Sequence, residues 1–173
     1  MDLAALVRNV PDFPVPGIQF KDITTVLEDG DALRHIIDTW KARYSGRGLT
    51  AIVGVEARGF VFGGALAYAM GLGFVPARKP GKLPYKTISE SYALEYGVNE
   101  LHMHVDALKP GDKVVVIDDL LATGGTVDAV CKLVERLGAT IDELAFVIEL
   151  PPLKGREKLA RYPVNTMIEF MVE

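Results

Sequence analysis

The sequence predicts an α/β fold in which a central, mostly parallel sheet is flanked by helices on both faces. Short apolar runs rich in β-branched residues, at 51–55 and 113–117, are typical of strands that are buried on both sides. Segments with helical spacing of apolar residues alternate with such runs along the chain, as in βαβ units. The length of 173 residues suits a single domain, residues 1–173, with one core.

The elements are predicted from local signals in chain order. Residues 3–10 are expected to form a short helix, which the proline- and glycine-rich segment 11–17 ends, and 18–20 a short strand. Helical spacing predicts a helix over 31–44, with capping acids at 29–31. The further elements are a strand at 51–55, a helix at 59–70 ended by Gly71, strands at 74–77, 101–105 and 113–117, a helix at 127–137, and strands at 144–150 and 167–172.

Residues 78–98 stand apart from these elements. The segment is polar and punctuated by glycines, and it shows no clear core periodicity. A structureless segment of this length within a compact domain is usually functional. We therefore expect it to be a functional loop.

The most informative segment is 114–126, which reads VVVIDDLLATGGT. Gly124 and Gly125 allow backbone amides to approach a ligand closely, and the start of a helix behind such a loop favours an anion. Asp118 and Asp119 cannot share a phosphate, because like charges repel, so they are better placed for sugar hydroxyls or a metal ion. The pattern is neither a Walker A loop nor a dinucleotide fingerprint. It predicts a sugar-phosphate site, and a plain strand-turn-helix with solubilising acids is the weaker alternative.

This segment resembles the phosphoribosyl-pyrophosphate motif of the type I phosphoribosyltransferases, and its spacer 120–122 is similar to that of their adenine-specific members. Lys21 is one departure, since many relatives carry Arg, whose planar fork Lys lacks. Further segments resemble the same group in the same order: 12–23, 56–63, 78–84 with 92–97, and 153–159.

The resemblance implies transfer of a phosphoribosyl group from phosphoribosyl pyrophosphate to adenine, which yields AMP and pyrophosphate. It also implies Mg²⁺ bound mainly through substrate, a homodimer, a base-binding hood over residues 1–30 and a lid over 78–98. A phosphoribosyltransferase for another purine is one alternative. A non-catalytic sensor of phosphoribosyl pyrophosphate is another, although no spare helix-turn-helix segment or basic stretch is apparent in the sequence.

The resemblance also assigns roles to residues. Glu95 would accept or donate a proton at the purine imidazole, and Tyr96 would lie over the reaction centre. Arg58 would bind pyrophosphate through its fork, and Asp118 and Asp119 would hold the sugar hydroxyls directly or through the metal. The other expected substrate contacts are Gln19 through its backbone, Phe20 by stacking on the base, Lys21, the lid lysines Lys79 and Lys82, and the phosphate loop Ala122, Thr123, Gly124, Gly125 and Thr126.

The residue types alone leave plainer interpretations open. Phe20 can be an ordinary core residue, Arg58 can form a structural ion pair with Glu56 or another acid, and loop lysines are usually solvated. His102 and His104 form an H-x-H pair, but with no third ligand at suitable spacing a solvated strand face is expected.

Composition narrows the class of protein. A net charge of −4 gives no electrostatic reason to expect nucleic acid or an anionic membrane as partner. The single cysteine, Cys131, excludes an internal disulfide and suits a reducing compartment. No apolar run has the length of a membrane span, and residues 1–10 lack the pattern of a signal peptide. A cytoplasmic location is therefore expected.

Overall fold

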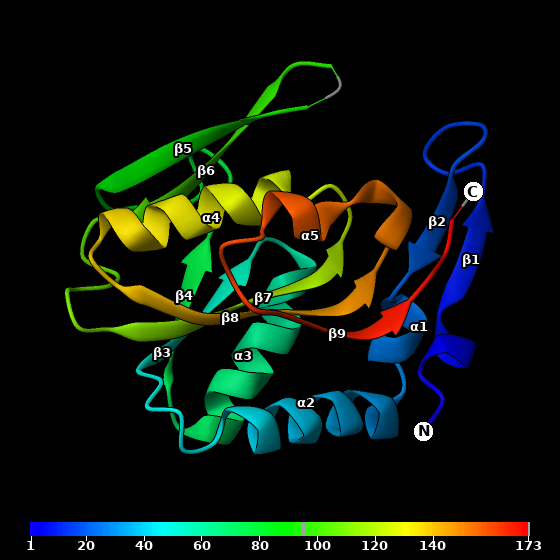
Figure 1. Cartoon of the computed structure of the whole chain (residues 1–173), viewed down its shortest axis with the longest axis horizontal. Coiled ribbons are helices and arrows are strands. Elements are labelled where there is room, and N and C mark those ends of the chain that lie inside the picture. Colours follow the sequence, from blue (N-terminus) through cyan, green and yellow to red (C-terminus); the bar gives the residue numbers. More distant parts are fainter. Residues whose placement is uncertain (95, 173) are drawn as a thin grey trace.

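The computed structural model describes residues 1–94 and 96–172, and its centre is a five-stranded sheet (Figure 1). The strand order is β4-β3-β7-β8-β9, and each neighbouring pair is parallel. The predicted fold class is therefore confirmed. The strands are β3 (Ala51–Val55), β4 (Gly73–Ala77), β7 (Lys113–Leu121), β8 (Thr140–Glu149) and β9 (Val164–Glu169).

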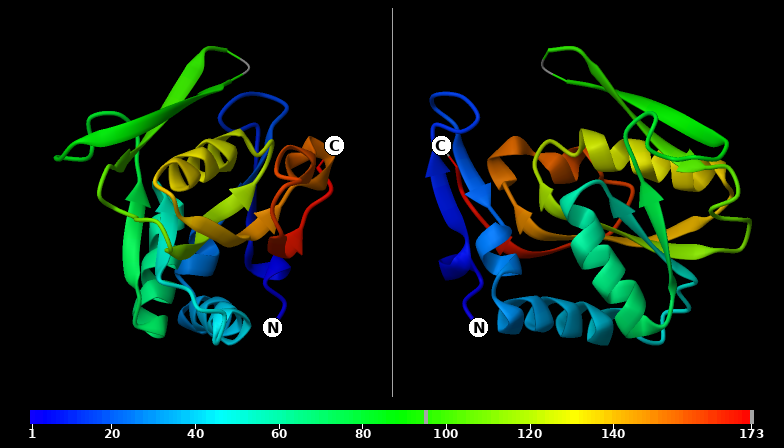
Figure 2. Two further views of the ribbon diagram at one scale, coloured as in Figure 1. Left: turned by 60° about the vertical axis from the view of Figure 1, so that its left-hand side comes forward. Right: turned by 180° about the vertical axis from the view of Figure 1, so that it is seen from behind.

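Helices cover both faces of the sheet (Figures 1 and 2). On one face lie α2 (Gly30–Tyr44) and α3 (Arg58–Met70), and on the other α4 (Gly125–Arg136) and the short α5 (Gly155–Lys158). The single turn α1 (Thr24–Leu27) precedes α2, and two 3₁₀ turns are η1 (Ala4–Leu6) and η2 (Pro151–Leu153).

Strand β7 shows why its apolar run is continuous. Val114 and Val116 pack in the core beneath α4, whereas Val115 and Ile117 pack in the core beside α2 and α3. All four side chains are fully buried, and each such burial contributes roughly 1.5–3 kcal/mol. A strand anchored on both faces holds the residues that follow it in fixed positions.

Several predicted boundaries are confirmed closely. Asp29 caps α2 by accepting hydrogen bonds from the amides of Asp31 and Ala32, and α3 ends at Gly71, whose φ is 66°. Strand β8 begins four residues earlier than predicted. The first residues of β8 are polar, so they do not show the apolar pattern of a buried strand. One of them, Glu143, is nevertheless buried, because it pairs with Arg43. Strand β9 also begins and ends three residues earlier than predicted, in register with β8.

The prediction that 78–98 lacks regular structure was wrong in part. Residues of this segment form β5 (Thr87–Ala93), which pairs antiparallel with β6 (Val98–His104) in a hairpin above α4 (Figure 1). Ile88 and Tyr92, on one face of β5, pack against the core, and Arg136 of α4 donates to the carbonyl of Ser89 at 2.6 Å. Two apolar residues gave too weak an alternation to reveal the strand.

The prediction of a helix over residues 3–10 was also wrong. Only the turn η1 forms, and the chain then becomes β1 (Arg8–Pro11), which pairs antiparallel with β2 (Gln19–Asp22). The apolar residues Leu3, Leu6, Val7 and Val10 have helical spacing, but pairing with β2 supplies the backbone hydrogen bonds from Arg8 onward. The β1–β2 pair stands beside the β9 edge of the sheet (Figure 1).

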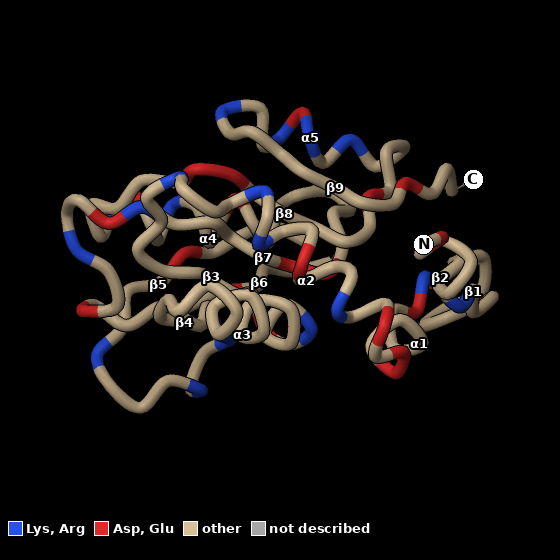
Figure 3. The backbone as a smooth tube through the Cα atoms, turned by 90° about the horizontal axis from the view of Figure 1, so that it is seen from below, with Lys and Arg blue, Asp and Glu red and all other residues tan. Residues whose placement is uncertain are grey.

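Lys and Arg positions are interspersed with Asp and Glu positions along the chain (Figure 3). Among the residues described, no helix combines the length and apolar character needed to cross a membrane.

Candidate active site

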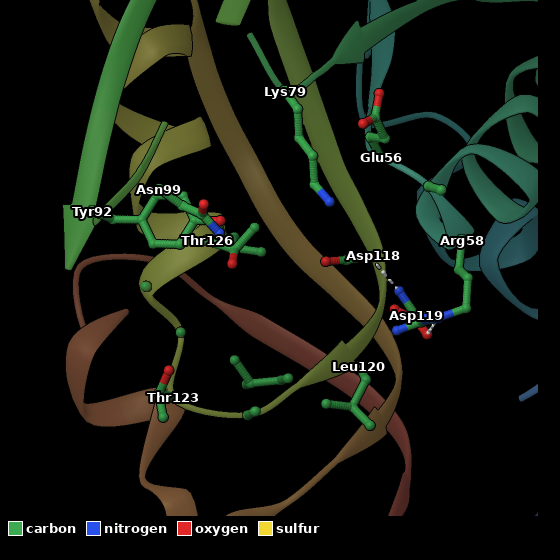
Figure 4. A pocket seen from close by; sticks show the side chains of 16 residues that line it. Glu56, Arg58, Lys79, Tyr92, Asn99, Asp118, Asp119, Leu120, Thr123 and Thr126 are labelled. Carbon is green, nitrogen blue, oxygen red and sulfur yellow. Dashed lines mark hydrogen bonds and ion pairs between the residues drawn. The ribbon is translucent and has the colours of Figure 1, made fainter. Parts of the chain in front are cut away.

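A cavity of about 440 Å³ lies at the carboxyl edge of the sheet, where β3 and β7 end and α4 begins (Figure 4). Ligands of open α/β sheets bind at this edge. Four segments that are distant in sequence meet there. The residues that line it are Glu56, Ala57, Arg58, Lys79, Tyr92, Asn99 and the continuous segment 118–127.

Asp118 and Asp119 face this cavity because the two strands beside β7, β3 and β8, stop pairing with it at different residues. Strand β3 pairs with β7 only as far as Ile117, whereas β8 continues beside it to Leu121. Asp118 and Asp119 therefore have a strand on one side and the start of α3 on the other. Although the acids were predicted to follow the strand, they lie within its carboxyl-terminal part.

The start of α3 lies unusually close to these acids. A Cβ atom on Gly59 would be 2.9 Å from the carbonyl oxygen of Ile117 and 3.0 Å from Oδ1 of Asp118. Only glycine fits that space without movement of the backbone. This close approach carries Arg58, the preceding residue, to the edge of the acid pair.

Arg58 and the two acids form one electrostatic unit. Nε of Arg58 donates to Oδ2 of Asp119 at 2.5 Å, and the arginine side chain remains half-exposed while that of Asp119 is buried. Partial burial opposes the charge of Arg58, but the Asp119 carboxylate outweighs it and raises the guanidinium pKa. Burial, followed by the charge of Asp119, raises the pKa of Asp118 well above its usual value. Such perturbed groups in a cleft are typical of functional sites.

The loop before α4 lines the cavity together with the open start of the helix. Gly124 has a φ of 85°, which glycine adopts without strain. The amide of Asp128 donates to the carbonyl of Gly124, so the amides before Asp128 belong to the open, positive end of α4. Tyr92 of β5 covers this end, since a Cβ atom on Gly125 would lie 3.5 Å from its ring.

The predicted lid residues are not gathered in one place. Lys79 lines the cavity, and its side chain points toward Asp118 in Figure 4. Lys82 is exposed and Tyr96 is 87% exposed, and neither belongs to the cavity lining. Glu95 lies outside the described residues.

The predicted base-binding residues lie in β2, outside the main cavity. Half-buried Phe20 lines a separate hollow of about 270 Å³ together with Val10, Phe13 and Asp22. The ring of Phe13 meets that of Phe20 edge-on, with 5.0 Å between their centroids. The guanidinium of Arg58 lies 6.0 Å from the centroid of Phe20. Arg58 therefore lies near the Phe20 ring while it is paired with Asp119.

Asn9 of β1 connects the other two predicted base contacts. Its side chain accepts a hydrogen bond from Nζ of Lys21 at 2.9 Å and donates to Oε1 of Gln19 at 2.7 Å. Nζ of Lys21 also lies 4.7 Å from the ring centroid of Phe170. Asn9 thus fixes the side chains of both residues in the β1–β2 pair.

Three polar residues of the cavity lining, Glu56, Tyr92 and Asn99, were not predicted as site residues. Glu56 comes directly after β3, just as Asp118 and Asp119 come directly after the buried part of β7. The rule that ligands bind where parallel strands end therefore also indicates Glu56. Its carboxylate pairs with Arg78. The plainer interpretation paired Arg58 with Glu56 or another acid, and the acid that pairs with Arg58 is Asp119. Tyr92 and Asn99 face each other as register partners in the hairpin. They reach the cavity only because the hairpin folds over the distant start of α4, so no local sequence signal reveals them.

The fit of the site to Mg²⁺ rests on the paired carboxylates. Mg²⁺ prefers oxygen ligands and is often held by one or two carboxylates together with substrate phosphates. Asp118 and Asp119 offer such oxygens, while the described part of the chain holds no group of three metal-ligating side chains. The His102 ring is hydrogen-bonded to Thr87 and Glu100. The site therefore fits an ion held chiefly through its substrate.

A sheet edge that combines the open start of a helix with paired acids and an arginine has the features expected of a transferase that acts on sugar phosphates. The family model of the phosphoribosyl transferase domain matches residues 24–170. An adenine phosphoribosyltransferase from Roseiflexus sp. (strain RS-1) is 61% identical over 169 residues, which cover 98% of each chain. The chain therefore belongs to the adenine phosphoribosyltransferase family.

Solved structures agree with this assignment. The crystal structure of adenine phosphoribosyltransferase from Thermoanaerobacter pseudethanolicus has a TM-score of 0.94 and 50% identity, covering 98% of both chains. That from Saccharomyces cerevisiae, complexed with adenine and an imino-altritol bisphosphate, has a TM-score of 0.92 and 39% identity, covering 96% of both chains.

Proposed function

We propose that the protein transfers the 5-phosphoribosyl group of phosphoribosyl pyrophosphate to adenine and releases AMP and pyrophosphate, a step of purine salvage. This makes it a pentosyltransferase of class EC 2.4.2.7. The observation that carries the proposal is the cavity in which the open end of α4 lies beside Asp118, Asp119 and Arg58. Nearly full-length similarity to adenine phosphoribosyltransferases supports the choice of reaction.

The chemistry requires stabilisation of two opposite charges. As the bond from C1 of ribose to pyrophosphate breaks, its electron pair leaves with pyrophosphate and positive charge develops on the sugar ring. Asp118 and Asp119 are proposed to hold the sugar hydroxyls and to favour the cationic ring, while Arg58 and Lys79 stabilise the leaving group. When Mg²⁺ is bound through the substrate, it neutralises further pyrophosphate charge.

The loop 122–126 is proposed to bind the 5′-phosphate. Its amides and the open end of α4 attract the anion, and Thr123 and Thr126 add hydroxyl groups. This phosphate is remote from the reacting bond, so the binding energy it supplies positions C1 without taking part in the chemistry.

Adenine is proposed to lie against Phe20, with the backbone of Gln19 and the Lys21 side chain near its polar edge. Arg58 lines the main cavity and its guanidinium lies 6.0 Å from the centroid of the Phe20 ring, which supports a base placed between Phe20 and the sugar. The Saccharomyces cerevisiae relative was crystallised with adenine. N9 of adenine would form the new bond to C1, and Glu95 would take up the N9 proton.

Two further properties are part of the proposal. Residues 78–98 would close over the substrates and exclude water, with Lys82 and Tyr96 moving toward the cavity. The protein would act as a cytoplasmic homodimer, supported by Val61 and Tyr68, which are 44% and 91% exposed and seven residues apart on α3. A monomeric mass in analytical ultracentrifugation at micromolar concentration would contradict the dimer.

The test is incubation of the purified protein with adenine, phosphoribosyl pyrophosphate and Mg²⁺, followed by detection of AMP. We expect AMP from the wild type and at least about tenfold slower formation by Asp119→Asn, which keeps the shape of the side chain but removes its charge. Binding of phosphoribosyl pyrophosphate without AMP formation would instead indicate a non-catalytic sensor.

A further inference from the structure

A buried carboxylate lies behind the phosphate loop, outside the proposed catalytic residues. Glu149 is the last residue of β8, and its side chain is only 4% exposed. Nε of Arg156 donates to its Oε1 at 2.8 Å, and Nη2 of Arg156 lies 2.8 Å from Oε2. The hydroxyl of Thr166 donates to Oε2 at 3.0 Å. Both carboxylate oxygens are therefore hydrogen-bonded, and the arginine fork is fixed in direction.

This ion pair fixes α5 in place. Arg156 is the second residue of α5, and its guanidinium also donates to the carbonyl of Val164 at 3.1 Å. The arginine therefore joins α5 to the ends of both β8 and β9. The carboxylate hydrogen bonds also raise the pKa of Arg156, which keeps it charged.

Gly155, the residue before Arg156, is in direct backbone contact with the phosphate loop, residues 122–126. A Cβ atom on Gly155 would be 2.5 Å from the carbonyl oxygen of Ala122, and one on Gly124 would be 3.0 Å from the carbonyl oxygen of Gly155. The two backbones are thus in contact with no side chain between them. Leu159, just after α5, packs on the same spot, 3.4 Å from the Cβ position of Gly124. Helix α5 therefore packs against the phosphate loop through Gly155 and Leu159 (Figure 1).

We propose that Arg156, held by Glu149, is a positioning residue for binding of the 5′-phosphate: it keeps Gly155 against the loop, so that the amides at 124–126 remain directed at the anion. The inference rests on the proposed function for the identity of that anion. Arg156 itself does not line the cavity.

The expected kinetic signature is specific. The 5′-phosphate lies away from the bond that breaks, so a looser loop should raise KM for phosphoribosyl pyrophosphate much more than it lowers kcat. A role limited to folding would lower stability and the amount of active protein without altering either constant.

The test compares Arg156→Gln and Arg156→Lys with Arg43→Gln. Arg43 is a matched control, because it makes the same two-pronged contact with a buried acid, Glu143, outside the cavity lining. Binding of ribose 5-phosphate is measured by calorimetry, and KM and kcat by AMP formation. We expect Arg156→Gln to weaken ribose 5-phosphate binding and raise KM for phosphoribosyl pyrophosphate by about tenfold. Arg156→Lys should show a smaller rise, and Arg43→Gln none.

Unchanged binding in Arg156→Gln, or an equal change in Arg43→Gln, would overturn the proposal. If Arg156→Gln fails to fold, Arg156→Lys decides by the same criterion. A wild type that binds ribose 5-phosphate but makes no AMP would refute the proposed function. The affinity of Arg156→Gln for ribose 5-phosphate, compared with that of the wild type, would still decide the role of Arg156. A wild type that makes AMP but does not bind ribose 5-phosphate would overturn the role of Arg156 in 5′-phosphate binding and leave the proposed function standing.

Discussion

A single methyl group at Gly59 should separate α3 from the acid pair. The Cβ atom of Gly59→Ala would lie 2.9 Å from the Ile117 carbonyl oxygen, 3.0 Å from Oδ1 of Asp118 and 3.2 Å from its Cα. Two of these are backbone atoms, which cannot rotate away, so overpacking should cost about 1–3 kcal/mol. Gly64 in the same helix has no atom within 4 Å of its Cβ position, and Gly64→Ala should stabilise by roughly 1 kcal/mol through helix propensity.

The two variants are compared by urea unfolding and by AMP formation. Displacement of α3 shifts Arg58 relative to Asp118, and a misplacement of about 1 Å can cost on the order of 100-fold in rate. We expect Gly59→Ala to lose about 10- to 100-fold in turnover, while Gly64→Ala retains wild-type activity. If both variants proved equally stable and equally active, the close approach of α3 to β7 would not be what aligns the site.

Other residues give further predictions. Because burial and Asp119 raise the pKa of Asp118, the stability associated with its protonated form is present below the unfolded-state pKa, about 3.9, and is lost as the pH rises through the higher folded-state pKa. Asp118→Asn should therefore be more stable than the wild type at pH 7, by roughly 0.5–2 kcal/mol, yet much less active. The gain in stability should shrink toward pH 4. A gain that is independent of pH in thermal melts would contradict this reasoning. Limited proteolysis should cut the chain without ligand within 78–98, and phosphoribosyl pyrophosphate with Mg²⁺ should slow that cut; equal rates with and without ligand would argue against a lid. Glu95→Gln should lower kcat while phosphoribosyl pyrophosphate binding stays within about twofold in calorimetry, and normal turnover would remove its role in proton transfer.

The central sheet and the phosphate loop could be predicted from sequence because their signals are local. The run Val114–Ile117 identifies a strand buried on both faces, and the acids and glycines after it mark the ligand edge. The start of β8 could not be predicted, because buried Glu143 is stabilised by Arg43, which is distant in sequence.

The parts that were missed depend on strand pairing that the residue pattern of either strand alone does not reveal. Strand β5 has only Ile88 and Tyr92 as apolar contacts, and its partner supplies the rest of its order. Strand β1 lies in a segment with helical spacing, and its pairing with β2 outweighs that local preference. For the same reason the cavity residues Tyr92 and Asn99 became apparent only in three dimensions.

The most direct test of the account is a competition between adenine and hypoxanthine for phosphoribosyl pyrophosphate, with all products quantified. A site that matches the ring nitrogen and amino group of adenine leaves buried polar groups unpaired with a 6-oxo purine, which can cost a factor of about 10⁴. We predict one AMP for each pyrophosphate released, with the hypoxanthine product at less than about one thousandth of the AMP. Comparable use of hypoxanthine, or pyrophosphate release without AMP, would contradict the account.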